Sequence, residues 1–141
     1  MAATDLNSVR ATIESRLEEE LRNAPTAPVV FQNSDYKPTS NSTWCQCLLS
    51  FGDSTYQSLG GATASTNNIS GVVSINIFTA KGKGSGTNFK LAKRVRDLYN
   101  RIIVSGVSFD PPIGPQVLET SNPEGYFQTQ IRVTFNVFED L

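Results

Sequence analysis

An apolar segment, a glycine-rich stretch and an amphipathic segment follow one another between residues 69 and 103. Residues 69–79 are rich in β-branched and aromatic side chains without helical periodicity, so they predict a strand. Three glycines among residues 80–86 disfavour a regular element there, because glycine loses much backbone entropy on ordering. Apolar residues then recur at three- and four-residue steps, which predicts a helix over 88–103. This order favours a fold in which helices pack on a sheet.

The same order of strand, glycine loop and helix occurs in phosphate-binding loops. A P-loop needs a lysine and then Ser or Thr directly after its last glycine. Lys81 and Lys83 instead precede the last glycine, Gly86. The third glycine of a dinucleotide fingerprint would fall on Thr87 or Phe89. The spacing therefore argues against a nucleotide site, and Thr87 is expected to cap the helix that follows.

Residues 5–23 predict the first helix. Its apolar residues form one narrow stripe: Leu6, Val9, Ile13, Leu17 and Leu21. Thr4 is expected to cap this helix, and Pro25 and Pro28 end it. Pairs of opposite charge at i,i+4 spacing each add about 0.3 kcal/mol: Arg10–Glu14, Arg16–Glu20 and Glu18–Arg22.

Strand patterns fill most of the remaining chain, at about residues 29–33, 43–51, 54–59, 69–79, 116–120 and 126–138. The last of these alternates between apolar and polar residues almost without exception, which is typical of an antiparallel sheet with one packed face and one wet face. Residues 110–115, with three prolines, predict an extended connection. The element order is roughly α-β-β-(β)-β-α-β-β. We therefore expect an α+β fold, a single domain over residues 1–141, with a largely antiparallel β-sheet packed by two α-helices.

The chain has no histidine, which removes the commonest general base and a common metal ligand. Its two cysteines, Cys45 and Cys47, share one face of a predicted strand and are expected to be buried apolar thiols. Acidic side chains cluster only in surface-type runs. The sequence therefore favours a protein that is not an enzyme. We assign no catalytic, cofactor-binding or metal-binding residue and expect no cofactor.

No stretch approaches the ~20 consecutive apolar residues of a membrane-spanning helix. The first residues also lack the basic and apolar regions of a secretory signal. We therefore expect a reduced, intracellular setting and no membrane contact.

Charge is unevenly placed along the chain, although the net charge is only −1. Basic residues concentrate between Lys81 and Arg101, where Asp97 is the only acid, and acids dominate after Ser105. Complementary patches on one protomer would suit a head-to-tail contact between copies, which closes into a ring when the rotation permits. The simplest alternative is that these charges only face solvent.

We assign a candidate assembly interface to the residues that carry this segregated charge: Lys81, Lys83, Lys90, Lys93, Arg94, Glu18, Glu19, Glu139 and Asp140. Residues 81–86 are expected to form a flexible basic loop within it. A small nucleic-acid-binding module that uses the basic residues is a further alternative, and its DNA affinity would fall steeply with salt.

Several short strings stand in a recognisable order: Val9-Arg-Ala-Thr-Ile13, Pro28-Val-Val-Phe-Gln-Asn33 with Tyr36-Lys-Pro38, Leu59-Gly-Gly61, Gly71-Val-Val-Ser-Ile-Asn-Ile-Phe78, and a closing strand from Gly125-Tyr-Phe127 to Asp140. With the two helices between them, these strings resemble the tail terminator (tail-completion) proteins of tailed bacteriophages. The resemblance covers nearly the whole chain. The highly basic loop and helix depart from it, and no family role maps onto them.

The resemblance implies a structural virion protein without catalytic residues. Such a protein would form a hexameric ring in the tail–neck region, cap the tail tube, end its polymerisation and provide the joint to the head. Its partners would be copies of itself, the tail tube protein, a head-side neck or connector protein and, in a contractile tail, the sheath. DNA would pass through the ring without specific binding, and assembly would take place in the host cytoplasm. Another head-to-tail connector or neck protein is the alternative.

Overall fold

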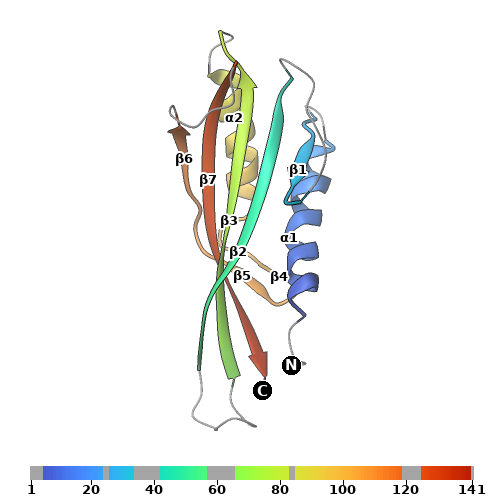
Figure 1. The fold of residues 1–141 in the computed structure, drawn as a ribbon, viewed down its shortest axis with the longest axis vertical. Coiled ribbons are helices and arrows are strands. Elements are labelled where there is room, and N and C mark those ends of the chain that lie inside the picture. The colour runs from blue at the N-terminus through green and yellow to red at the C-terminus, as the bar shows by residue number, and fades with distance from the viewer. Residues whose placement is uncertain are drawn as a thin grey trace.

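The computed structural model describes residues 5–23, 26–33, 42–56, 66–82, 85–118 and 125–140. Within these residues two helices and seven strands form one α+β domain, as predicted (Figure 1). The elements in chain order are α1 (Leu6–Leu21), β1 (Val29–Phe31), β2 (Trp44–Tyr56), β3 (Thr66–Ala80), α2 (Gly86–Leu98), β4 (Ile103–Val104), β5 (Val107–Phe109), β6 (Ile113–Leu118) and β7 (Tyr126–Asp140).

The sheet has the order β1-β2-β3-β7-β5-β4, and β6 pairs with the other half of β7. All neighbours are antiparallel except β1, which runs parallel to β2. The β3–β7 ladder is the central strand pairing of the sheet and runs from the pair Thr66–Asp140 to the pair Ala80–Tyr126. At a rise of about 3.3 Å per residue this ladder is roughly 45 Å long. Figure 1 shows the resulting elongated shape, with both helices on one side of the sheet.

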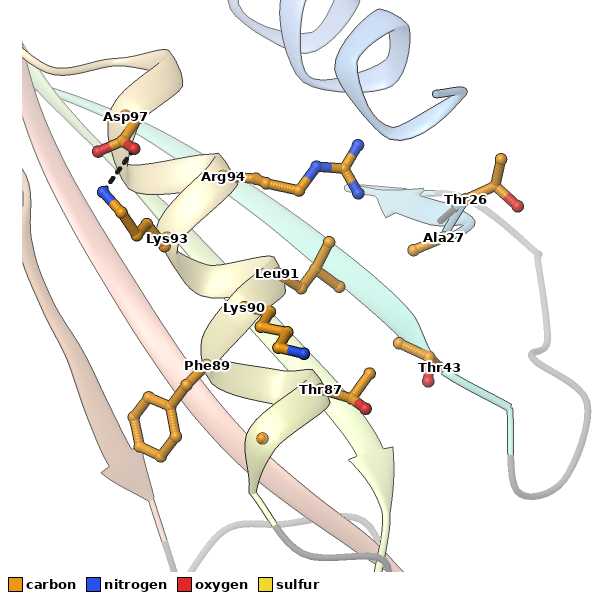
Figure 2. Close-up of a pocket in the computed structure, with 11 residues that line it drawn as sticks. Thr26, Ala27, Thr43, Thr87, Phe89, Lys90, Leu91, Lys93, Arg94 and Asp97 are labelled. Carbon is orange, nitrogen blue, oxygen red and sulfur yellow. Dashed lines mark hydrogen bonds and ion pairs between the residues drawn. The ribbon is translucent and has the colours of Figure 1, made fainter. Parts of the chain in front are cut away.

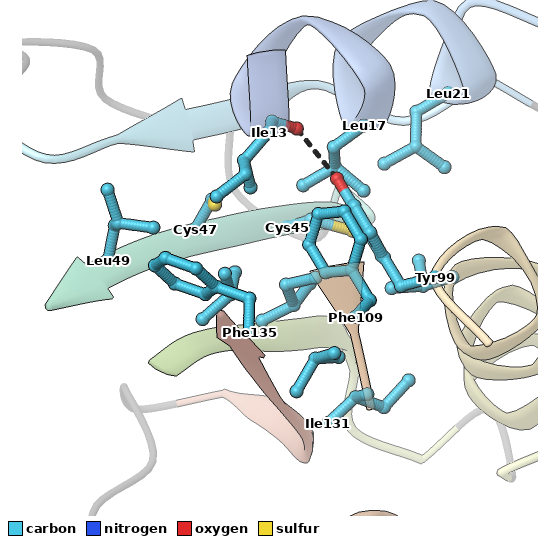
Figure 3. Close-up of a cluster of buried hydrophobic side chains, with 14 of the residues drawn as sticks. Ile13, Leu17, Leu21, Cys45, Cys47, Leu49, Tyr99, Phe109, Ile131 and Phe135 are labelled. Atoms are coloured by element: carbon cyan, nitrogen blue, oxygen red, sulfur yellow. Dashed lines mark hydrogen bonds between the residues drawn. The ribbon is translucent and has the colours of Figure 1, made fainter. Parts of the chain in front are cut away.

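The core lies between the helices and the face of the sheet that they cover (Figure 3). Alternate residues of the central strands are fully buried, including Val73, Ile75 and Ile77 on β3. Cys45 and Cys47 are 0% and 1% exposed, which confirms the prediction of buried thiols. The remaining face of the sheet, which we call the open face, carries no helix among the described residues.

Both predicted helices form, but their ends differ from the prediction. α2 ends at Leu98 rather than at residue 103, and Arg101 has a left-handed φ of 54°. The helix therefore does not reach Ile103. This residue belongs to β4 instead, where its side chain is 74% exposed. Thr87 is not the cap of α2, since the helix begins at Gly86.

The cap of α1 is Asp5 rather than Thr4. The Asp5 carboxylate accepts a hydrogen bond of 3.0 Å from the backbone N–H of Asn7. A carboxylate at this position also meets the positive end of the helix dipole, which favours it over a hydroxyl. α1 spans Leu6–Leu21, slightly less than the predicted 5–23.

The strands predicted at 43–51 and 54–59 are one strand, β2, with a bulge between Phe51 and Ser54. Gly52 lies within this irregularity, so the break between the two predicted strands is a local bend of one continuous strand. β1 ends at Phe31 rather than residue 33, because Asn33 adopts a left-handed φ of 57° in a turn. Residues 57–59 lie outside the described residues.

The largest omission of the prediction is the hairpin of β4 and β5. Ser105 and Gly106 form its turn with φ of 49° and 82°, the positive values that a tight hairpin turn requires. The strand predicted at 116–120 corresponds to β6, which begins earlier, at Ile113. Pro115 is tolerated within it because β6 pairs on one side only among the described strands. The strands predicted at 69–79 and 126–138 extend to 66–80 and 126–140.

Candidate assembly surfaces

A groove of about 850 Å³ runs between α2 and the segments that lead into β1 and β2 (Figure 2). Its floor is mostly apolar and its rim is charged; the lining residues are Thr26, Ala27, Thr43, Gly86, Thr87, Phe89, Lys90, Leu91, Lys93, Arg94 and Asp97. The groove exists because α2 lies over β3 and β7 and leaves the start of β2 uncovered. It brings Lys90, Lys93 and Arg94 of the predicted interface to one surface.

Arg94 is turned inward, toward α1. Its guanidinium donates to the backbone carbonyl of Glu20 at 2.8 Å and to that of Asn23 at 3.3 Å. Its Nε also pairs with the Glu20 carboxylate at 3.3 Å. The predicted pair between Arg16 and Glu20 is therefore wrong, and Arg16 instead donates to the backbone carbonyl of Leu98 at 3.1 Å. Two arginines thus fasten the helices to each other.

The other cations of this surface point outward. Lys93 pairs with Asp97 at 2.8 Å, an exposed i,i+4 contact of small energetic value. Lys81, at the end of β3, and Lys90 are exposed, and neither forms an ion pair within the described residues. Lys83 lies outside the described residues. The uncompensated positive charge that the structure describes here is therefore that of Lys81 and Lys90.

The acidic members of the predicted interface lie elsewhere. Glu18 and Glu19 are exposed on α1, and Glu18 pairs with Arg22 at 2.7 Å. Glu139 and Asp140 end β7, opposite Asn67 and Thr66 at the far end of the long ladder from Lys81. Their side chains lie outside the described residues. Figure 1 shows that the start of α2 and the C-terminal end of β7 lie at opposite ends of the molecule.

A buried polar cluster fixes the basic helix on the sheet. Asn88 is 0% exposed, and its amide donates to the backbone carbonyl of Ile77 at 3.0 Å. It also reaches Thr79 and the backbone carbonyl of Phe127, both at 3.4 Å, and accepts a hydrogen bond from Thr129. Sequence analysis missed this residue, although an asparagine within the apolar arc of an amphipathic helix is a usable signal. The cluster sets where Lys90 lies on the surface.

The open face of the sheet carries a row of amide side chains across three strands. Asn76 on β3 donates to Gln46 on β2 at 3.2 Å and accepts from Gln130 on β7 at 3.1 Å. Gln128 also donates to Asn76, at 3.0 Å. Strand alternation puts these residues opposite the buried positions of their strands, but the sequence gives no indication that they bond to one another.

Beside the amide row, Trp44 stacks on Phe78 with ring centroids 4.2 Å apart. The Nε1 atom of Trp44 is buried and has no hydrogen-bond partner among the described residues. No described group of three or more His, Cys, Asp or Glu residues is arranged to hold a metal ion. No described helix is long and apolar enough to cross a membrane.

The described residues thus form a small α+β domain with exposed lysines around the start of α2. The family model described as phage tail terminator protein matches residues 8–135, so the chain belongs to the phage tail terminator family. This is a family of structural proteins, and the protein is a virion component with a structural role in phage tail completion that involves other tail components.

The fold is also found among solved structures. One such structure, of a protein without a descriptive name, is 18% identical to this chain and superposes with a TM-score of 0.70. The match covers 95% of this chain and 96% of the other, so the whole fold is shared. No curated protein matches the chain.

Proposed function

We propose that six copies of this protein form a ring that caps the finished tail tube, ends its polymerisation and provides the joint to the head-side neck. Membership of the tail terminator family is the observation that carries this proposal. The segregated charge supports it, because a joint must present different surfaces to different partners. The domain is proposed to be one unit over residues 1–141.

The nine charged residues of the predicted interface are proposed to serve two of these surfaces. Lys81 and Lys90 are exposed around the start of α2, whereas Glu139 and Asp140 end β7 at the opposite end of the molecule. A neighbouring subunit or the tail tube is the proposed partner of the basic surface. Arg94 supports this surface from inside by holding α2 against α1.

DNA is proposed to pass through the ring without specific binding. The net charge of −1 suits a conduit, because tight phosphate contacts would slow the passage of a duplex. Assembly in the host cytoplasm and a position between tail and neck follow from this role, as does contact with a sheath if the tail contracts.

The oligomeric state and the effect on tail length test the proposal together. Mass photometry of the purified protein is expected to show hexamers, alone or on addition of tail tubes, and negative-stain images are expected to show rings at one tube end. Infection with a phage that lacks the protein is expected to yield tails of irregular, excessive length. A protein that stays monomeric with tubes present, or tails of normal length without it, would contradict the proposal. Normal tail length with binding to the portal or its adaptors would favour a different neck component.

A further inference from the structure

Two edge strands flank the upper half of the sheet, β1 on one side and β6 on the other (Figure 1). β1 pairs only with β2, and β6 only with β7, among the described residues. The outer backbone N–H and C=O groups of both strands therefore have no strand partner in the described chain. Such an edge is a ready template for pairing with another chain.

β1 has only three residues and β6 contains Pro115, two features that limit edge pairing, but neither edge strand carries a charge. Charges, particularly lysines, are the common means of preventing edge pairing. Ile113 and Val117 on β6 are 50% and 44% exposed. Pro115 removes one backbone donor and the register with β7 shifts between Ile113 and Gln116, but residues 116–118 pair with β7 in regular register. An uncharged, partly apolar edge of this kind indicates an interface.

The other described edges of the sheet carry a charge or a bulge, or are shorter still. The half of β2 that lies beyond β1 contains Asp53 and a bulge between Phe51 and Ser54, which bends the strand. β4, at the end of the lower half, has only two residues. Among the described edges, β1 and β6 are therefore the uncharged edge strands longer than two residues, and they lie on opposite sides of one sheet.

The strand directions allow these two edges to meet in a ring. β1 runs parallel to β2, and β7 also runs in this direction because two antiparallel pairings separate it from β2. β6 is antiparallel to β7 and therefore to β1. When copies are related by rotation about an axis along the strands, β6 of one copy meets β1 of the next as an antiparallel pair. This pairing is the more stable kind, and its two different edges make the contact heterologous, as a ring requires.

We propose that β6 of one copy pairs with β1 of the next copy, so that the sheets of neighbouring subunits are continuous around the ring. This inference rests on the proposed ring. It leaves the charged ends of the molecule, with Lys81 at one and Asp140 at the other, free for partners above and below the ring.

The face of the sheet to which each side chain points makes the proposed pairing of β6 with β1 testable. Val30 shares the open face with its partner Gln46, and Gln116 shares that face with its partner Gln130. Val117 pairs with Thr129 and so points to the helix-covered face. Facing side chains on adjacent antiparallel strands have Cβ atoms about 4.5–5.5 Å apart, whereas side chains on opposite faces do not meet.

The experiment uses cysteine pairs in the full chain. Val30→Cys is combined with Gln116→Cys, or with Leu118→Cys to cover the next register on the same face; Val30→Cys with Val117→Cys is the opposite-face control. The native cysteines are at most 1% exposed and do not compete. Mild oxidation of the assembled protein is expected to give a ladder of covalent multimers for one open-face pair, roughly tenfold more than for the control, since disulfides demand close Cβ atoms.

Mass photometry under reducing conditions separates the two proposals. Hexamers that give no ladder with either open-face pair would overturn edge pairing and leave the ring intact. Equal cross-linking of the opposite-face control would also overturn edge pairing, because side chains on opposite faces of paired strands do not meet. Absence of hexamers from the unsubstituted protein, with and without tail tubes, would overturn the ring and the edge pairing with it.

Discussion

Arg94 and Glu20, which are 74 residues apart in sequence, are joined by a guanidinium that donates to the Glu20 backbone carbonyl at 2.8 Å and pairs with its carboxylate at 3.3 Å. The contact ties the exposed side of α2 to the last turn of α1. The unpaired carbonyls of a helix C-terminus carry partial negative charge, so a cation there satisfies both a hydrogen-bonding and an electrostatic requirement.

Replacement of this arginine tests its structural role. Arg94→Ala is expected to lower the free energy of unfolding by about 1.5–3 kcal/mol, because it removes hydrogen bonds from a charged donor. Lys93→Ala on the same helix removes only an exposed ion pair and is expected to change stability by less than about 1 kcal/mol. Urea denaturation followed by circular dichroism measures both. Equal effects of the two substitutions would show that Arg94 contributes no more than a surface charge.

Asn88→Ala is expected to destabilise the protein by about 2–3 kcal/mol, because the buried Thr129 hydroxyl and the backbone carbonyl of Ile77 each lose a partner. Thr87→Ala is the matched control on the preceding residue, which is exposed and is not the cap of α2. Limited proteolysis and urea denaturation are the measurements. A variant at position 88 as stable as the control would mean that the cluster is not needed to seat α2.

Two glycines are expected to respond in opposite ways to alanine. A Cβ atom at Gly71 would lie 2.3 Å from the Phe135 ring and 2.8 Å from the Ser50 carbonyl oxygen. Gly71→Ala is therefore expected to cost about 1–3 kcal/mol through overpacking. A Cβ atom at Gly86, in the first turn of α2, meets nothing within 4 Å. Gly86→Ala is expected to raise the thermal midpoint, since alanine favours the helix by up to about 1 kcal/mol.

Alkaline pH is expected to destabilise the fold through its buried thiols. Burial raises the pKa of Cys45 and of Cys47 from 9.0 to about 12, and burial likewise raises the pKa of Tyr99. Between pH 9 and 12 the unfolded chain loses these protons while the folded protein keeps them, so stability falls as pH rises. Each thiol contributes about 1.4 kcal/mol per pH unit in this window.

The urea midpoint at pH 7, 9 and 10.5 measures this dependence. Replacement of both cysteines by alanine is expected to remove the contribution of the thiols to the fall of the urea midpoint with pH. The contribution of Tyr99 is expected to remain. A midpoint that does not change above pH 9 would contradict the assignment.

Charge reversal at Lys81 and Lys90 tests the proposed basic surface. Both side chains are exposed, so Lys81→Glu with Lys90→Glu is expected to leave the fold intact while it weakens assembly or tube binding at least tenfold, about 1.4 kcal/mol. Arg101→Glu, an exposed change outside the groove, is the control. Mass photometry and co-sedimentation with tail tubes are the measurements. Unchanged assembly would show that these lysines only face solvent.

Much of the fold was predictable because it depends on short-range periodicity. Alternation placed Val73, Ile75 and Ile77 on a buried face, and helical spacing placed Leu91 and Val95 against the sheet. A side-chain period of two or of 3.6 residues is a local property of the backbone, so the residue pattern reports it directly. The element ends were less accurate, since they depend on turn residues such as Arg101 and Ser105.

The candidate surfaces were only partly predictable. Sequence alone located the basic segment, but it counted Arg94 with the exposed cations and missed Asn88. Both errors have one cause: whether a polar side chain faces solvent or a distant carbonyl depends on which element packs beside it. The contacts of Arg94 with Glu20 and of Thr129 with Asn88 span 74 and 41 residues.

The sequence by itself determined the fold class, the faces of the long strands and the separation of basic from acidic segments. Tertiary structure alone decided which cations remain free, where the amide row forms and which strands become edges. An edge is a property of the order of strands in the sheet. No local pattern in β1 or β6 specifies that order, because the place of both strands depends on the β3–β7 ladder between them, which pairs residues far apart in the sequence.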